Sequence, residues 1–292
     1  MPKYRGLKAN ITPTNKSLSK MIEQFIAFKR AQGLAERTLE DYNNNLEAFK
    51  KCANNDTLDN LEETCLIFFT RFNNSAPATY NIPYKNLNCF FNWLISQEYL
   101  EYNPLKRIGL KIRKEESRIR HHESDNLRKL LDSIDLSTYT GLRDYALILL
   151  TLDTEIRPSE AFGLKNEAID FQHNKVQIKR EISKTRTSRM LPLSSQVTSI
   201  LEKFISIKPP GFEEYLFMSC DGNPMNKNSW AKRLYLYCEK AKIPSISPYS
   251  LRHCFAIYFL RAGGHVFALQ YEMGHSDLST TRKYINLAQK DP

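Results

Sequence analysis

The chain has 292 residues, of which 42 are Lys or Arg and 32 are Asp or Glu, so its formal net charge is +10. Hydrophobic residues make up 41% of the chain and charged residues 25%, which predicts a packed globular protein and argues against an intrinsically disordered one. The excess of cations suits a polyanionic partner, although it does not distinguish DNA from RNA or from an acidic membrane.

Targeting and redox signals favour a cytoplasmic protein. Residues 1–17 are polar and basic without the apolar stretch of a signal peptide, and the longest apolar run, near residues 145–152, is too short to span a bilayer. The cysteines show no CxxC spacing and no paired histidine pattern, so we expect reduced thiols and no zinc site. We therefore expect a cytoplasmic location and no membrane partner.

The first half of the chain has the periodicity of amphipathic helices. Apolar residues fall on one helical face over residues 18–28, and a second helix is expected to start at Thr38. A third helix is predicted to begin near Thr57, whose side chain could cap it, and a fourth to run from about Ala78 and end before Asn103-Pro104. We expect the many aromatic residues of the fourth helix to fill a core rather than to stack on bases.

A change in composition separates the two halves. Residues 111–122, KIRKEESRIRHH, are almost wholly charged and predict a linker, which is also able to touch DNA. Ser124 is expected to cap the next helix, a buried helix is expected over residues 141–152, and a short helix is expected to begin at Pro158, a residue suited to the first helical turn. The second half therefore begins as a helical region of its own.

A short β-hairpin is predicted next. Val176, Ile178 and residues 180–182 alternate in the manner of a strand, residues 190–193 form a second strand, and residues 184–189 form a basic turn between them. After Ser194 the pattern is helical again. The fold class expected from the sequence is mainly α with a small antiparallel β-sheet, in two domains.

Five polar side chains of the second half could together carry a reaction: Arg157, Lys184, Arg252, His275 and Tyr284. Phosphoryl transfer without a metal must draw positive charge from side chains, and arginine can bind two phosphate oxygens at once. A phenol has a pKa of about 10, so nearby cations are needed to favour its nucleophilic form. The sequence shows no Asp and Glu cluster for Mg²⁺, which argues against a metal-dependent nuclease. A basic chain can offer such a set by chance, and His253 and His265 are expected to be structural.

The spacing of these residues resembles the tyrosine recombinase family, also called the phage integrase family. Residues 154–164 (TEIRPSEAFGL) resemble its first arginine motif, and residues 183–193 (SKTRTSRMLPL) its lysine motif on a β-hairpin. Residues 247–253 (SPYSLRH) resemble its second arginine motif. Residues 273–284 (MGHSDLSTTRKY) resemble its final motif, where the tyrosine follows the histidine by nine positions. The resemblance extends over essentially the whole chain.

The resemblance implies a role for each matching residue. Arg157 and Arg252 would bind the non-bridging oxygens of the scissile DNA phosphate, and His275 would hydrogen-bond to it. Tyr284 would be the nucleophile that forms a 3′-phosphotyrosyl link, and Lys184 would protonate the leaving 5′ oxygen. Since that link conserves the energy of the broken bond, neither a metal, nor ATP, nor another cofactor is expected.

Two further positions matter to the resemblance. Glu160 would be a supporting residue that orients its neighbours. Tyr249 stands three positions before Arg252, where the family usually has a histidine that assists proton movement. A phenol can hydrogen-bond to a phosphate but is a poor base near neutral pH, so we expect Tyr249 to reshape the pH dependence of cleavage without abolishing it.

The resemblance also implies a domain plan. A basic N-terminal segment would span residues 1–17, a helical core-binding domain residues 18–110, the linker residues 111–122 and a mixed α/β catalytic domain residues 123–292. The two domains would form a C-shaped clamp on DNA.

The expected function is site-specific recombination of double-stranded DNA by an integrase-type enzyme, which would assemble as a tetramer on its site and could use accessory DNA-bending proteins. The alternative is a catalytically impaired DNA-binding accessory protein of the same fold. A type IB topoisomerase shares the chemistry, but the motifs look more like a recombinase.

Overall fold

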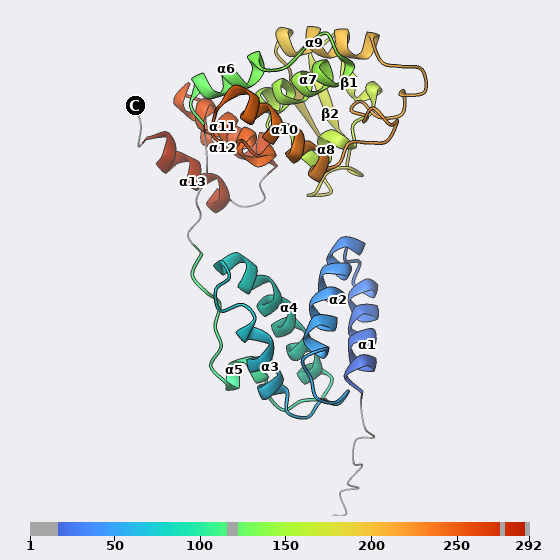
Figure 1. The fold of residues 1–292 in the computed structure, drawn as a ribbon, viewed down its shortest axis with the longest axis vertical. Helices are drawn as coiled ribbons and strands as arrows, with labels where there is room; N and C mark the ends of the chain where they lie inside the picture. Colours follow the sequence, from blue (N-terminus) through green and yellow to red (C-terminus); the bar gives the residue numbers. More distant parts are fainter. Residues whose placement is uncertain (1–16, 116–121, 275–277, 290–292) are drawn as a thin grey trace, which may run out of the picture. The chain divides into compact units, whose positions relative to one another are not determined.

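A computed structural model describes residues 17–115, 122–274 and 278–289, and in it the chain forms two units, residues 1–117 and 118–292 (Figure 1). The division falls within residues 111–122, the predicted linker, while the exact domain bounds given above stay predictions. His275 lies outside the described residues. Within the described ranges, no helix is long and apolar enough to cross a membrane.

The first unit consists of helices that enclose an aromatic core. They are α1 (Leu18–Ala31), α2 (Glu36–Lys50), α3 (Leu61–Thr70), α4 (Pro77–Ser96) and α5 (Pro104–Arg107). Phe25 lies at the centre, with its ring centroid 5.4 Å from that of Tyr42 and 5.3 Å from that of Phe90, both nearly edge-to-face. Such pairs add about 0.5–1.5 kcal/mol each beyond the burial of their area. The aromatic residues of α4 therefore fill the core, as predicted.

The start of the third helix was predicted wrongly. α3 begins at Leu61 rather than near Thr57, and its N-cap residue Asn60 adopts a left-handed conformation (φ 53°). The residue before Thr57 caps a different helix, because the carboxylate of Asp56 accepts hydrogen bonds from the Ser17 hydroxyl (2.6 Å) and from the Ser19 backbone N–H (2.8 Å) at the start of α1. This long-range cap fixes the loop before α3 against α1.

The second unit combines helices with a three-stranded sheet (Figure 1). Its helices are α6 (Ser124–Asp132), α7 (Tyr139–Thr154), α8 (Pro158–Phe162), the 3-10 turn η1 (Asn166–Ala168), α9 (Ser195–Ser206), α10 (Lys227–Ala241), α11 (Pro248–Arg261), α12 (Val266–Met273) and α13 (Leu278–Ala288). Its strands are β1 (Ile169–Asp170), β2 (Lys175–Ile178) and β3 (Arg189–Pro192). Pro158 occupies the first turn of α8 as predicted, whereas Ser124 lies inside α6 and Glu123 is its N-cap.

The sheet is antiparallel in the order β1-β2-β3, and β1 was not predicted. Val176 pairs with Leu191 and Ile178 with Arg189. Val176 and Ile178 are both buried, so this face of β2 lies against the core. The prediction that β2 continues through residues 180–182 is wrong. The chain turns there instead, because the N–H groups of Ile182 and Ser183 both donate to the carbonyl of Lys179 (3.3 and 3.2 Å).

The candidate site depends on how α7 and α11 pack. α7 contacts both α9 and α11, and α11 also contacts α12 and α13. α7, α11, α12 and α13 therefore pack together in the second unit, and α8 begins four residues after the end of α7. Their polar residues are the ones that the sequence motifs single out.

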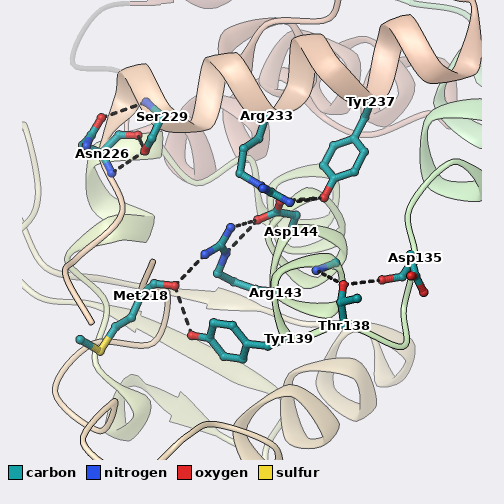
Figure 2. Close-up of polar contacts among 11 residues, drawn as sticks. Asp135, Thr138, Tyr139, Arg143, Asp144, Met218, Asn226, Ser229, Arg233 and Tyr237 are labelled. Carbon is teal, nitrogen blue, oxygen red and sulfur yellow. Dashed lines mark hydrogen bonds and ion pairs between the residues drawn. The ribbon is translucent and has the colours of Figure 1, made fainter. Parts of the chain in front are cut away.

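A buried ion network ties α7 to α10 away from that site (Figure 2). The carboxylate of Asp144 pairs with the guanidinium of Arg143 (2.7 Å), is contacted by Arg233, and accepts a hydrogen bond from the Tyr237 hydroxyl (2.9 Å). Arg143 also donates to the carbonyl of Met218 (2.9 Å). Asp144 and Arg143 are both buried, so each needs the other's charge.

We predict that Asp144→Asn destabilises the second unit. The substitution leaves two arginines facing a neutral amide, and breaking a buried ion pair from one side costs about 3–5 kcal/mol. Urea denaturation followed by circular dichroism measures the loss in the free energy of unfolding. Asp132→Asn, at an exposed position of α6, is the control and should stay within about 0.5 kcal/mol of wild type. An Asp144→Asn loss as small as that of the control would contradict the prediction.

Candidate functional site

Glu160 joins two arginines of the candidate site. Its carboxylate accepts two hydrogen bonds from the Arg189 guanidinium (3.1 and 2.7 Å), one from the Arg157 guanidinium (3.2 Å) and one from the Arg157 backbone N–H (3.1 Å). Burial acts to raise the pKa of Glu160, but the hydrogen bonds and charges of Arg189 and Arg157 outweigh it and lower that pKa below its ordinary value. Glu160 is fully buried and ionised, so it holds both guanidinium groups in fixed positions.

Arg189 is a site residue that the sequence analysis did not single out. Its strand β3 alternates, with Arg189 and Leu191 buried and Met190 exposed. A charged residue on the inward face of a strand needs a buried partner, and Glu160 supplies it. The signal was present in the sequence as an arginine two positions before an inward-facing leucine.

Arg157 also holds the end of α12. Its guanidinium donates to the backbone carbonyls of Met273 (2.9 Å) and Gly274 (3.2 Å), which are among the last carbonyls of that helix. A cation is favourable at this negative end of the helix dipole. Gly274 has φ +56°, and a Cβ there would lie 3.3 Å from Arg157 Nη1, so glycine allows this close approach. The contact fixes the first two residues of the final motif.

Arg252 and Glu155 form a second buried ion pair. Arg252 Nη2 lies 2.9 Å from Glu155 Oε2, and both residues are buried. Glu155 ends α7 in a left-handed conformation (φ 51°), which directs this carboxylate into the site. Burial raises the pKa of Glu155 to about 8, against the charges of Arg252, Arg157 and Arg189, and burial likewise lowers the pKa of Arg252. Neither the charge of Glu155 nor that of Arg252 is fully compensated by the other. Arg252 Nη1 has no hydrogen-bond partner among the described residues.

Tyr284 lies on α13 with its hydroxyl inside the protein. The residue is 4% exposed, and its Oη is 2.7 Å from Nδ1 of His253 on α11. Burial raises the pKa of Tyr284 to about 12, while the charge of Arg252 lowers it and Glu155 raises it further. Burial and the charge of Arg252 lower the pKa of His253 to about 4. At neutral pH the phenol is therefore protonated and the imidazole neutral.

The structure does not gather all of the predicted site residues. Lys184 is exposed in the turn between β2 and β3, and no hydrogen bond or ion pair joins it to Arg157, Arg252 or Tyr284 in the described ranges. Tyr249 is 45% exposed in the first turn of α11, where the ammonium of Lys227 lies 5.1 Å from its ring centroid.

The arrangement resembles no metal site. Among the described residues, His, Cys, Asp and Glu side chains nowhere gather in a group that could hold a metal ion. All six cysteines are free thiols. Three arginines, two of them buried, and a buried phenol gather instead, which suits an anionic substrate and a covalent intermediate.

Comparison with known proteins identifies the family. The pattern of the phage integrase family matches residues 119–291. The chain belongs to the phage integrase family. Its relatives include tyrosine recombinase XerD of Listeria monocytogenes, 26% identical over 287 residues (93% of this chain, 95% of the relative), and tyrosine recombinase XerC of Salmonella typhi, 27% identical over 285 residues (94% and 93%). The chain is accordingly a tyrosine recombinase, which confirms the resemblance carried by the four motifs.

Solved structures of integrases share its fold. The Tn1549 transposon integrase in complex with a circular intermediate DNA has a TM-score of 0.75 at 18% identity, covering 92% of this chain and 94% of that one. A lambda integrase dimer bound to a COC′ core site has a TM-score of 0.77 at 14% identity, covering 95% and 79%. The predicted fold class, mainly α with a small antiparallel sheet, is confirmed.

We predict that Glu160→Gln loosens the site. The amide cannot balance the charges of Arg157 and Arg189, so the free energy of unfolding should fall by about 3–5 kcal/mol. Glu167→Gln is the matched control, because Glu167 forms an exposed ion pair with Lys179 that contributes about 0–1 kcal/mol. Equal stability of the two variants in urea would show that Glu160 is not the residue that holds the arginines.

Proposed function

We propose that this tyrosine recombinase performs site-specific recombination by cleaving and rejoining DNA through a 3′-phosphotyrosyl link on Tyr284, without metal or ATP. The observation that carries the proposal is the buried phenol of Tyr284, whose hydroxyl lies 2.7 Å from Nδ1 of His253, the residue that directly follows the buried Arg252 on α11. Arg252, Arg157 and Tyr284 come from α11, the start of α8 and α13, so the fold itself brings these groups together.

The arrangement supports a specific first step. The guanidinium groups of Arg252 and Arg157 neutralise the non-bridging oxygens of the scissile phosphate as negative charge develops there. Tyr284 Oη forms a bond to phosphorus while the bond from phosphorus to the 5′ oxygen breaks. Lys184 gives its proton to the leaving oxygen, as an exposed lysine on a turn is free to do once DNA is bound. The reverse attack by a 5′ hydroxyl rejoins a strand.

Other residues would support this step. Glu160 keeps Arg157 in place, and Arg157 in turn holds the end of α12, where the final motif begins. His275 would hydrogen-bond to the phosphate. Tyr249 is exposed, so it could reach a DNA phosphate in place of the usual histidine.

DNA and further copies of the chain are the proposed partners. The Tn1549 and lambda integrases, which share this fold, have been solved with DNA, and the net charge of +10 suits the same polyanion. We propose that the first unit and the catalytic unit clamp a double-stranded recombination site, and that four chains assemble on paired sites, in some cases with DNA-bending proteins.

The alternative is a DNA-binding accessory protein that has lost catalysis. Two observations favour it: Tyr249 replaces the usual histidine, and the Tyr284 phenol is held in its neutral form by burial. Against it, Arg157, Arg252 and Tyr284 are all present, and Arg252 is kept buried at an electrostatic cost that a binding-only protein would not need.

A nicked substrate separates these two functions. A duplex selected from a random pool by binding to the protein, and nicked so that the cleaved end diffuses away, should trap a covalent protein–DNA adduct in the presence of EDTA. Tyr284→Phe should bind the same duplex and form no adduct. Tyr271→Phe, at an exposed tyrosine of α12, is the matched control and should react as wild type does. Tight binding without any wild-type adduct would support the accessory protein instead.

The role of Lys184 has its own test. Lys184→Ala should slow adduct formation by about 10²–10⁴-fold, the usual contribution of a general acid. A duplex with sulfur in place of the bridging 5′ oxygen should restore the rate, because a thiol has a pKa of about 8.5 and leaves without a proton. Lys179→Ala, in the same turn region, should react normally with both substrates. A Lys184→Ala defect of equal size on the sulfur substrate would rule out proton donation.

A further inference from the structure

The contact between His253 and Tyr284 is not explained by the roles assigned so far. The two rings come from α11 and α13, their centroids are 5.6 Å apart, and the Nδ1 to Oη distance is 2.7 Å. His253 was expected to be a structural residue. It directly follows Arg252, so one turn of α11 presents a guanidinium and an imidazole to the same phenol.

The protonation states define the direction of this hydrogen bond. Because the pKa of Tyr284 lies near 12 and that of His253 near 4, the phenol is the donor and Nδ1 of the neutral imidazole the acceptor at neutral pH. The proton of the imidazole is then on Nε2. The phenol hydrogen already points at a base, which is the geometry that general-base catalysis requires.

We propose that His253 is a catalytic residue that positions the Tyr284 hydroxyl and accepts its proton as the phenol attacks the DNA phosphate. The proposal rests on the proposed function of Tyr284. In the step, the proton moves from Tyr284 Oη to His253 Nδ1 while the Oη–P bond forms and the bond to the 5′ oxygen breaks. Lys184 protonates that oxygen, so His253 gains the proton of Tyr284 and the leaving strand gains one proton from Lys184.

Arg252 couples this base to substrate binding. Its positive charge is one of the two causes that make His253 a weak base, the other being burial. A phosphate bound to Arg252 compensates that charge and brings a negative charge close to the imidazole, so both effects favour the imidazolium. His253 therefore becomes a stronger base when the substrate is in place.

The other charged groups around Tyr284 and His253 have weaker effects on the transfer of the proton between them. Glu155, at the end of α7, raises the pKa of Tyr284 and therefore opposes ionisation of the phenol. On α12, which packs against α11 and α13, Glu272 has a pKa raised by burial and so shifts towards its neutral form. On α13, Arg282 and Lys283 are exposed, and solvent screens their charges.

Substitution of His253 by Asn and by Phe separates proton transfer from packing. Asn keeps an acceptor oxygen near the position of Nδ1 but is not a base, and Phe keeps the ring without an acceptor. With the nicked duplex, we expect His253→Asn to bind DNA as wild type does and to form the adduct about 10²–10⁴-fold more slowly at pH 7. Its rate should rise steeply from pH 6 to 9 as hydroxide replaces the missing base, while the wild-type rate rises less. His253→Phe should be at least as slow.

The outcomes are distinct. A His253→Asn rate and pH profile equal to those of wild type would overturn proton transfer to His253, and so would a slower rate with an unchanged pH profile, which indicates packing alone. Absence of a wild-type adduct would instead overturn the proposed function of Tyr284.

A second measurement needs no substitution, in case the variants fail to fold. On the sulfur-bridged duplex no proton goes to the leaving group, so slower wild-type adduct formation in D₂O reports the transfer from Tyr284. An equal rate in D₂O and H₂O would overturn the proposal.

Discussion

Three arginines gathered in the interior of the second unit are the constraint on which the rest of this structure depends. A guanidinium stays charged at any working pH, so a buried one needs carboxylates or carbonyls around it. Glu160 forms ion pairs with Arg157 and Arg189, and Glu155 forms one with Arg252. Arg157 also donates a hydrogen bond to a carbonyl at the end of α12. The second unit is therefore assembled around the candidate site, since the contacts that compensate the arginines also connect its elements: Glu155 of α7 with Arg252 of α11, and Glu160 of α8 with Arg189 of β3 and, through Arg157, with the end of α12.

The compensation is incomplete, and this matters for function. The carboxylate of Glu155 has a pKa raised to about 8, so near neutral pH it only partly balances Arg252. In the proposed function, a DNA phosphate would bring the missing negative charge to these preorganised donors. The same burial keeps Tyr284 neutral. In the proposed reaction, cations alone would not activate a phenol in this state, so the proposal assigns the removal of its proton to the adjacent imidazole of His253.

The sequence predicted most of the fold, for physical reasons that can be named. Helical periodicity located α1, α2, α4 and α7, and the fixed φ of Pro158 placed the start of α8. Contacts between residues far apart in the chain could not be predicted from these local patterns. Asp56 caps α1 across 37 residues, and the Thr57 hydroxyl accepts a hydrogen bond from the Asp59 N–H and does not cap α3. The turn at Lys179 interrupts an alternation that continues in the sequence.

In the candidate site, too, the sequence predicted individual residues but not the contacts between them. Motif spacing singled out Arg157, Arg252 and Tyr284, but it could not reveal their partners, because Glu155 and His253 reach the site only through a left-handed helix end and through the packing of α13 on α11. Arg189 could have been found, since a charge on the inward face of a strand signals a buried partner.

The most direct test of the account is to find which atom carries the DNA. The covalent adduct would be digested with nuclease and trypsin, and mass spectrometry would locate the remaining nucleotide on the peptides. The account predicts a nucleotide attached through its 3′ phosphate to Tyr284, in the peptide that continues with Ile285 and Asn286. A nucleotide on another residue, such as Tyr271 or Tyr249, or attachment through a 5′ phosphate, would contradict it.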